Sequence, residues 1–112
     1  MSDSKKQHVE VAIVTVTANK LHEECLQSVQ RLMRETPLRT AFIVVDNAST
    51  AFDAHSYVKQ HVPEAIVILR DNNPGFGASC NRGACEIDAD YYFFLNPDTR
   101  IDDLTAIDRL HT

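Results

Sequence analysis

The feature that most constrains the fold is an alternation, along almost the whole chain, between short apolar runs and amphipathic segments. The apolar runs are rich in β-branched and aromatic residues, which is typical of buried strands. The predicted strands cover residues 9–17, 40–46, 65–70 and 91–95. Between them, apolar residues recur at helical spacing. The predicted helices cover 21–35, a segment from a cap at Thr50 to about His61, 76–87, and a last segment beginning at Asp102 or Asp103.

A repeated strand–helix order with short loops predicts an α/β fold, in which a parallel sheet is covered by helices and has right-handed crossovers. The 112 residues fit one domain or part of one. Residues 1–8 are polar and predicted to form a flexible tail, and 9–112 to form the folded unit. Four strands leave an unprotected sheet edge. We therefore expect the chain to be one half of something larger, or to pair with a second copy through that edge.

The composition excludes several classes of protein. A formal net charge of −5 disfavours binding to nucleic acid or to an anionic membrane surface. Three cysteines, an odd number without a close pair, argue against a disulfide framework or a zinc site and favour a reducing, cytoplasmic compartment. No apolar run approaches the length of a membrane span, and the N-terminus lacks the apolar core of a signal peptide.

Short hydrogen-bonding side chains follow every predicted strand. In a parallel sheet these loops emerge on one side, where ligands bind at the carboxyl ends of the strands. The four loops are Thr17–Asn19, Asp46–Ser49, Asp71–Gly75 and Asn96–Thr99. Any one of them is explained by turn formation alone. The four together indicate a binding site, and the aspartates of the second and fourth loops are its candidate ligands.

The glycines Gly75 and Gly77 raise the alternative of a dinucleotide-binding domain. The glycine-rich turn of that fold follows the first strand, whereas these glycines follow the third, and Cys80 stands at the third glycine position. A turn leading into a helix N-terminus can still face a phosphate. A tight turn that requires glycine accounts for the same residues almost as well.

Four stretches, in this order and spacing, resemble the nucleotide-sugar-binding half of family 2 glycosyltransferases, and most closely those of the bacterial rhamnosyltransferase type. They are IVTVTAN (13–19), IVVDNAS (43–49), NNPGFGASCNRG (72–83) and YYFFLNPDT (91–99). The resemblance implies a Rossmann-like GT-A fold, here cut short after about four strands. It also implies inverting transfer from a UDP-, dTDP- or GDP-linked sugar to a saccharide or lipid-linked acceptor. Such enzymes build cell-surface polysaccharides in the cytoplasm, in some cases at the inner face of the membrane.

The resemblance assigns roles residue by residue. The implied nucleotide-binding residues are Thr17, Asn19, Asp46, Ser49, Asn73, Gly75 and Asn81. The first two would line the nucleotide pocket, Asp46 would accept the imino N–H of the base, and the last three would lie near the ribose and diphosphate. Asp98, with Asn96, would hold the Mg²⁺ or Mn²⁺ that bridges the diphosphate oxygens.

Three residues depart from the family pattern. Asn96 replaces the first aspartate of the Asp-x-Asp element, Ala18 stands where an aromatic residue is usual, and Cys80 stands where many members have arginine. Family domains also run about twice as far, and their second half supplies the acceptor site and the catalytic base. The resemblance therefore predicts donor binding by this chain with little or no transfer. The alternative is a non-catalytic protein that keeps the fold as an interaction module.

Overall fold

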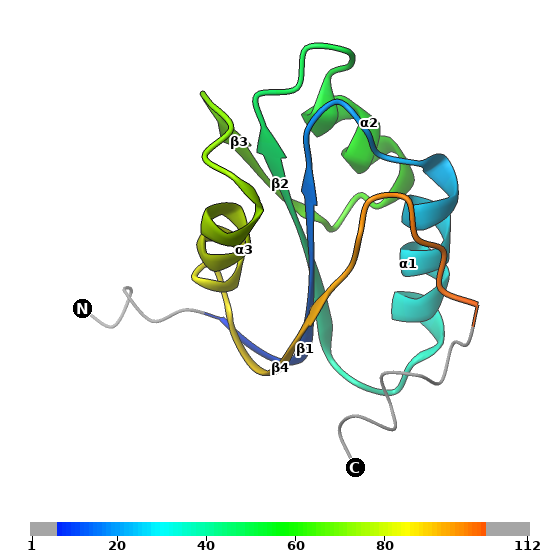
Figure 1. Cartoon of the computed structure of the whole chain (residues 1–112). Coiled ribbons are helices and arrows are strands. Elements are labelled where there is room, and N and C mark those ends of the chain that lie inside the picture. The colour runs from blue at the N-terminus through cyan, green and yellow to red at the C-terminus, as the bar shows by residue number, and fades with distance from the viewer. Residues whose placement is uncertain (1–6, 103–112) are drawn as a thin grey trace.

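The structure is a computed structural model that describes residues 7–102. Strands and helices alternate along this part of the chain, as predicted (Figure 1). The strands are β1 (His8–Thr17), β2 (Thr40–Asn47), β3 (Ile66–Arg70) and β4 (Asp88–Phe94). The helices are α1 (Glu23–Glu35), α2 (Ala54–His61) and α3 (Phe76–Ala84). The predicted helix after Asp102 lies outside the described residues.

The four strands form one parallel sheet in the order β3-β2-β1-β4. The chain moves outward from β1 through β2 to β3 and then returns to add β4 on the other side of β1. This reversal between β1 and β4 is a topological switch point, the place where the carboxyl ends of parallel strands leave a crevice for a ligand. The register places Val14 opposite Phe94 on one side and opposite Ile43 on the other.

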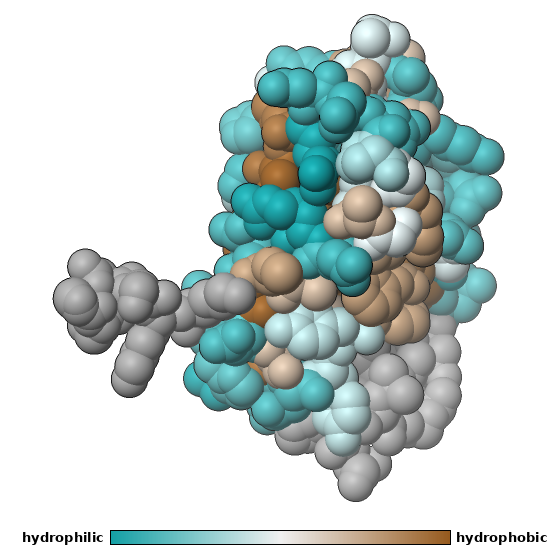
Figure 2. Space-filling model, turned by 60° about the vertical axis from the view of Figure 1, so that its left-hand side comes forward, coloured by the Kyte–Doolittle hydropathy of each residue, from teal (hydrophilic) through white to brown (hydrophobic). Residues whose placement is uncertain are grey.

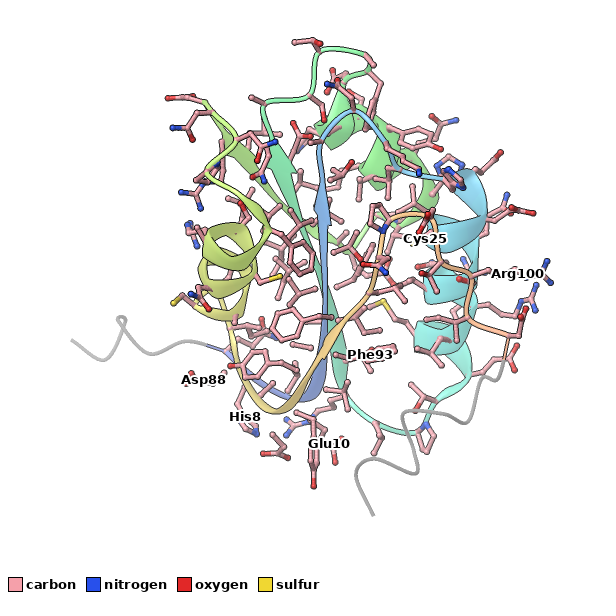
Figure 3. All side chains as sticks on the ribbon, viewed as in Figure 1. His8, Glu10, Cys25, Asp88, Phe93 and Arg100 are labelled. Atoms are coloured by element: carbon pink, nitrogen blue, oxygen red, sulfur yellow. The ribbon has the colours of Figure 1, made fainter. Side chains whose placement is uncertain are left out.

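Helices cover both faces of the sheet, α1 and α2 on one and α3 on the other (Figure 1). The first face carries the larger core cluster, where α1 residues such as Leu26 and Val29 pack on Ile13 and Phe42. Figure 3 shows Phe93 on this side of β4, and it packs against the same cluster. The core cluster on the second face is smaller, and in it Cys80 of α3 packs among branched residues of β1 and β2.

The predicted strand at 91–95 is not a buried strand. It begins earlier, at Asp88, and its aromatic side chains Tyr91, Tyr92 and Phe94 are 43%, 36% and 45% exposed. The physical reason is the strand order, because β4 has a neighbour on one side only within the described residues. Figure 2 shows apolar residues interrupting the polar surface of one face of the molecule. β1 and β2, in the middle of the sheet, are buried over nearly their whole length.

Two helix boundaries differ from the prediction. Asp53, and not Thr50, caps α2, because its Oδ1 accepts a hydrogen bond from the Ser56 N–H at 3.2 Å. Thr50 instead donates to the side chain of Asn19, 31 residues earlier. α3 ends at Ala84 because the chain turns there to enter β4.

Gly83 allows α3 to lie directly on the sheet. A Cβ atom at this position would stand 2.7 Å from Val14 Cγ1 and 3.1 Å from Val45 Cγ2, both on fully buried side chains. We expect Gly83→Ala to lower the free energy of unfolding by about 1–3 kcal/mol through overpacking, despite alanine's better helix propensity. Gly77→Ala is the matched control in the same helix, since a Cβ atom there would meet nothing within 4 Å.

Gly77→Ala should be neutral or stabilising by up to about 1 kcal/mol, the difference in helix propensity between the two residues. Urea unfolding followed by circular dichroism measures both variants. Equal changes in the two variants would contradict the close packing of α3 on Val14.

Candidate functional site

The four loops that follow the strands meet at one edge of the sheet, as predicted. This edge, called the rim below, comprises residues 17–22, 46–53, 71–75 and 95–99. Side-chain hydrogen bonds join the first loop to the second and the second to the third. An ion pair joins the first loop to the fourth. The predicted site residues of these loops are therefore gathered in one region.

Asp46, at the end of β2, carries the most unusual atom of the rim. The residue is 5% exposed, and its Oδ2 accepts a hydrogen bond from the Ser49 N–H at 3.2 Å. Its Oδ1 is buried with no hydrogen-bond partner. A buried acceptor without a partner costs about 1–3 kcal/mol, and more when it is charged. Such an atom at the end of a central strand is a candidate for a donor that arrives with a ligand.

Asp46 and Asn47 point to opposite faces of the sheet because they are adjacent in a strand. Phe42 and Val44, in phase with Asp46, pack in the cluster beneath α1 and α2. Thr15, on the neighbouring strand, has a buried hydroxyl that also lacks a partner. The face of the sheet that carries Asp46 thus contains two unpaired buried oxygens, one of them on a carboxylate.

Asn19 holds the first two loops together. It adopts a left-handed backbone conformation, with φ of 63°, which asparagine tolerates better than most residues. Its N–H donates to Ser49 Oγ at 2.7 Å, and its Oδ1 accepts from the N–H groups of Thr50 at 2.6 Å and Ala51 at 2.7 Å. Asn19 and Ser49, both predicted nucleotide-binding residues, are therefore neighbours that bind each other and set the position of the loop above Asp46.

Asn47 is a rim residue that the sequence reasoning missed. It is 4% exposed, its Nδ2 donates to Asn73 Oδ1 at 3.1 Å, and its Oδ1 accepts from Ser79 Oγ at 2.6 Å. Asn73 Oδ1 also accepts from the Gly75 N–H at 3.1 Å. This chain of bonds fixes the third loop and the start of α3 against β2. The available signal was strand alternation, which turns Asn47 toward α3 once Asp46 faces the other side.

Gly75 precedes α3 with φ of 105°, a conformation that L-residues with a side chain rarely adopt. No side chain caps this helix, so its first N–H groups are available to an anion in the way that helix N-termini commonly are. Asn81 is exposed and lies in the second turn of α3, about 9 Å along the axis from Gly75. Of the predicted nucleotide-binding residues it is the one farthest into a helix.

The loop Asn96–Pro97–Asp98 rests on the start of α1. The Pro97 carbonyl accepts from the His22 N–H at 3.0 Å, and the Asn96 carbonyl accepts from the Thr99 N–H at 3.1 Å. Cys25 lies beneath this loop (Figure 3), with its Sγ 3.8 Å from the Asn96 carbonyl oxygen. Burial, with a smaller contribution from the Asp98 carboxylate, raises the pKa of the Cys25 thiol to about 11. Cys25 is fully buried and packs in the larger core cluster.

Lys20 is the second rim residue that the sequence reasoning missed. Its Nζ lies 3.5 Å from Asp98 Oδ2, and the two side chains are 60% and 46% exposed. The pair bridges the loops after β1 and β4, the two strands at the switch point. Thr17, predicted to line the pocket, is 1% exposed, and its Oγ1 bonds to both the N–H and the carbonyl of Lys20. It fixes the turn that carries Lys20.

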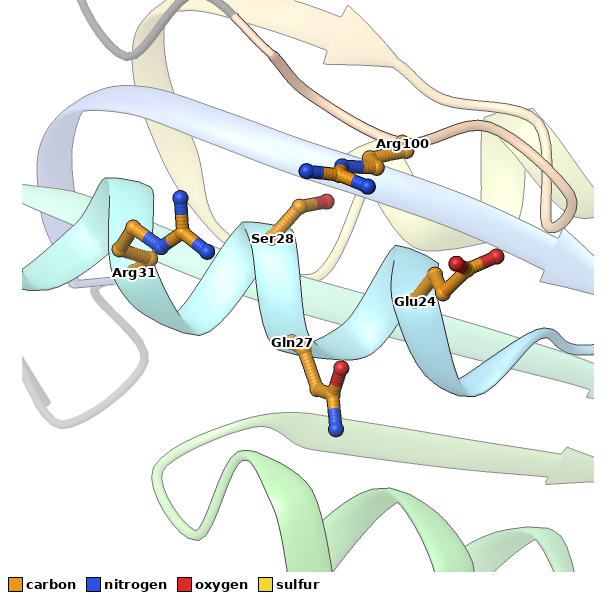
Figure 4. Close-up of a pocket in the computed structure, with 5 residues that line it drawn as sticks. All are labelled: Glu24, Gln27, Ser28, Arg31 and Arg100. Carbon is orange, nitrogen blue, oxygen red and sulfur yellow. The ribbon is translucent and has the colours of Figure 1, made fainter.

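A hollow among the described residues lies away from the rim (Figure 4). It has a volume of about 240 Å³ and is lined by Glu24, Gln27, Ser28, Arg31 and Arg100 on the outer side of α1. Ser28 Oγ already donates to the Cys25 carbonyl and accepts from the Ile101 N–H. Ser28 thus attaches the segment after β4 to α1. Separately, no helix among residues 7–102 is long and apolar enough to cross a membrane.

A comparison with models of known families matches residues 10–108 to glycosyl transferase family 2. The matched region covers nearly the whole chain and includes all four rim loops. The chain belongs to glycosyl transferase family 2. A search of curated proteins returned no match. Membership of this family implies, in general terms, a transferase that uses a nucleotide-sugar donor and an acceptor.

The metal-coordinating side chains at the rim of this family 2 glycosyltransferase can hold a divalent cation only if a bound ligand completes the coordination of the cation. Within residues 7–102, no three His, Cys, Asp or Glu side chains are grouped to hold a metal ion. Asp98 supplies one partly exposed carboxylate, and Asn96 could add its side-chain oxygen, since its backbone carbonyl is already engaged. Mg²⁺ typically takes one or two carboxylates, water and substrate phosphates. The rim suits that arrangement and not a cation cage made of protein alone.

Proposed function

We propose that this chain binds a nucleoside diphosphate sugar at the rim, together with Mg²⁺ or Mn²⁺, for inverting transfer to an acceptor hydroxyl. The observation that carries the proposal is the buried, unpartnered Oδ1 of Asp46. Uracil, thymine and guanine each offer an imino N–H, and a hydrogen bond to a carboxylate contributes about 1.5–3 kcal/mol. Donation from the base would also satisfy an acceptor that the protein leaves empty.

The other rim residues support the rest of the donor. Asn19 and Ser49 shape the wall around the base by fixing the first two loops against each other, and Thr17 fixes the turn at Lys20. The uncapped start of α3 after Gly75 offers N–H groups for the diphosphate. Asp98 and Asn96, in the loop after β4, would bind the cation. Asn81 of α3 is the last of the predicted nucleotide-binding residues and would lie near the ribose and diphosphate.

When bound, the cation would neutralise the charge that develops on the nucleoside diphosphate as it leaves the sugar. The chain's own part is to hold the base, orient the diphosphate and present the anomeric carbon to an acceptor. Because Asp46 and Asp98 both serve the donor, the proposal assigns no residue here as the base for the acceptor hydroxyl. We accordingly propose donor binding by this chain, with little or no transfer by it alone.

The finer assignment is a rhamnosyltransferase-like enzyme of cell-surface polysaccharide synthesis that works in the cytoplasm. It is supported by the resemblance of the NNPGFGASCNRG and YYFFLNPDT stretches, whose loop residues 72–75 and 96–99 lie at the rim. Calorimetric titration with UDP, dTDP and GDP, each with and without Mn²⁺, tests the proposal. Metal-enhanced binding of one nucleotide is expected. A folded chain that binds none of the three under either condition would refute it.

A second candidate function is pairing of two copies through β4. The supporting observation is the exposure of Phe94 and Tyr92 on a strand that pairs on one side only within the described residues. Exposed aromatic edge strands are templates for pairing with another chain. This candidate predicts a concentration-dependent dimer in sedimentation velocity that Phe94→Lys dissociates. A monomer at all concentrations up to about 100 μM, well above a micromolar dissociation constant, would exclude it.

A further inference from the structure

The pairing of Lys20 with Asp98 brings a cation to the position where the proposed function places Mg²⁺ or Mn²⁺. Lys20 Nζ and Asp98 Oδ2 are 3.5 Å apart, across the switch point between β1 and β4. An ammonium group and a divalent ion on one carboxylate repel each other. We therefore expect an arriving cation to displace the Lys20 head group from Asp98.

The Lys20 head group can move, although the backbone that carries it is held. The Thr17 hydroxyl bonds to both backbone groups of Lys20, and the preceding residue, Asn19, is anchored to Ser49. The two charged side chains are 60% and 46% exposed, and ion pairs of this kind are weak. A lysine has a flexible four-carbon stem and three donors that can be redirected. The turn that carries Lys20 thus limits the positions that its ammonium group can reach. Little free energy holds the ammonium group on Asp98.

A donor diphosphate is the anion that would enter the same crevice. The diphosphate oxygens would contact the displaced Lys20 ammonium beside the cation, because the ammonium and the cation both bind at Asp98. We propose that Lys20 is a ligand of the donor diphosphate, and that in the absence of donor it occupies Asp98 and weakens cation binding there. The inference rests on the proposed function and adds a residue and an order to it: the cation binds more tightly when a diphosphate is present to accept Lys20.

The test uses Lys20→Met, which keeps the length of the side chain and removes its charge. Arg34→Met is the matched control, since it also removes one positive charge but lies exposed in the last turn of α1. Inorganic pyrophosphate, titrated by calorimetry in the presence of EDTA, probes the diphosphate contact without the base or the metal. Free Mn²⁺ measured by electron paramagnetic resonance, without any phosphate, probes the cation position.

For Lys20→Met we expect pyrophosphate affinity in EDTA to fall about tenfold, the effect of losing one charged hydrogen bond. We expect its Mn²⁺ affinity without phosphate to rise about 2- to 5-fold, since the competing exposed ion pair is gone. Arg34→Met should match the parent in both measurements. Opposite changes in one variant cannot arise from a general loss of folding, which thermal unfolding of each variant checks independently.

Unchanged pyrophosphate affinity in Lys20→Met would overturn the inference, and so would unchanged or weaker Mn²⁺ binding. Neither result would affect base recognition by Asp46, which the nucleotide titrations measure separately. Conversely, failure of UDP, dTDP and GDP to outperform pyrophosphate would refute the proposed function while leaving the Lys20 contact standing.

Discussion

Replacing Asp98 with alanine should remove the gain in nucleotide affinity that Mn²⁺ provides. Asp98 is the partly exposed carboxylate of the fourth rim loop, and Asn96 can offer a cation only a neutral oxygen. Hard cations depend on carboxylate ligands. In the parent, calorimetry should show tighter binding of the preferred nucleoside diphosphate with Mn²⁺ than with EDTA. In Asp98→Ala the two titrations should coincide.

The control for Asp98→Ala is Asp102→Ala, which removes the same charge from a residue that is 80% exposed and pairs with Arg100. It should retain the effect of Mn²⁺. Affinity in EDTA should not fall in Asp98→Ala, because the change releases Lys20 from its ion pair. An Asp98→Ala variant that still gains affinity from Mn²⁺ would show that the cation binds elsewhere.

The order of strands and helices could be predicted because it depends on local sequence. Runs such as VEVAIVTVT combine β-branched residues with continuous apolar character, and β1 begins only one residue before the predicted strand. The rim also follows from simple geometry, since parallel strands have their carboxyl ends on one side. That geometry identifies Asp46 and Asp98 as candidates without any knowledge of their neighbours.

The lateral order of the strands cannot be predicted from local sequence. For this reason the exposure of β4 was predicted wrongly and Lys20 was missed. A run like YYFFL has the composition of a buried strand, yet at the edge of the sheet three of its five side chains are exposed. Lys20 reads as an ordinary surface lysine until β4 is placed beside β1, which brings Asp98 to it. Side-chain partners across a switch point depend on tertiary arrangement alone.

The error at the start of α2 has a different cause. Thr50 and Asp53 are both good cap residues, and local sequence does not choose between them. In the structure the Thr50 N–H and hydroxyl both donate to Asn19 Oδ1, and the helix begins at Ala54 with Asp53 as its cap. Asn47 was missed for a similar reason: its partner Ser79 is 32 residues away, and only the packing of α3 brings them together.

The rim is thus held by bonds that use up most of its polar atoms. The side-chain oxygens of Asn19, Asn47 and Asn73 all accept hydrogen bonds from within the protein. Asn19 Oδ1 accepts from Thr50 in the second loop, Asn47 Oδ1 from Ser79 of α3, and Asn73 Oδ1 from Asn47 and Gly75. The exception is Asp46, whose Oδ1 is buried without a partner. A preorganised site typically has a rigid surround and a functional group whose partner is supplied by the ligand. This contrast is what distinguishes Asp46 from the other predicted nucleotide-binding residues.

Asp46→Asn should weaken binding of the preferred nucleotide by about 10- to 100-fold, the range for losing a hydrogen bond to a carboxylate. Asparagine has nearly the same shape, and its Oδ1 can still accept from the Ser49 N–H. The atom facing the base then becomes an N–H donor, which cannot pair with the imino N–H of uracil, thymine or guanine. The effect of Mn²⁺ should persist, because Asp98 is unchanged.

The same substitution should improve binding of CDP, because N3 of cytosine is an acceptor and suits the new donor. The unliganded variant should be at least as stable as the parent in urea unfolding, since a buried carboxylate oxygen without a partner is exchanged for a neutral amide. Weaker binding of the preferred nucleotide, stronger binding of CDP and undiminished stability would together place the base against Asp46. If instead all four nucleotides weakened equally in a destabilised variant, Asp46 would be a structural residue of the rim, and its unpaired oxygen would have no role in recognition.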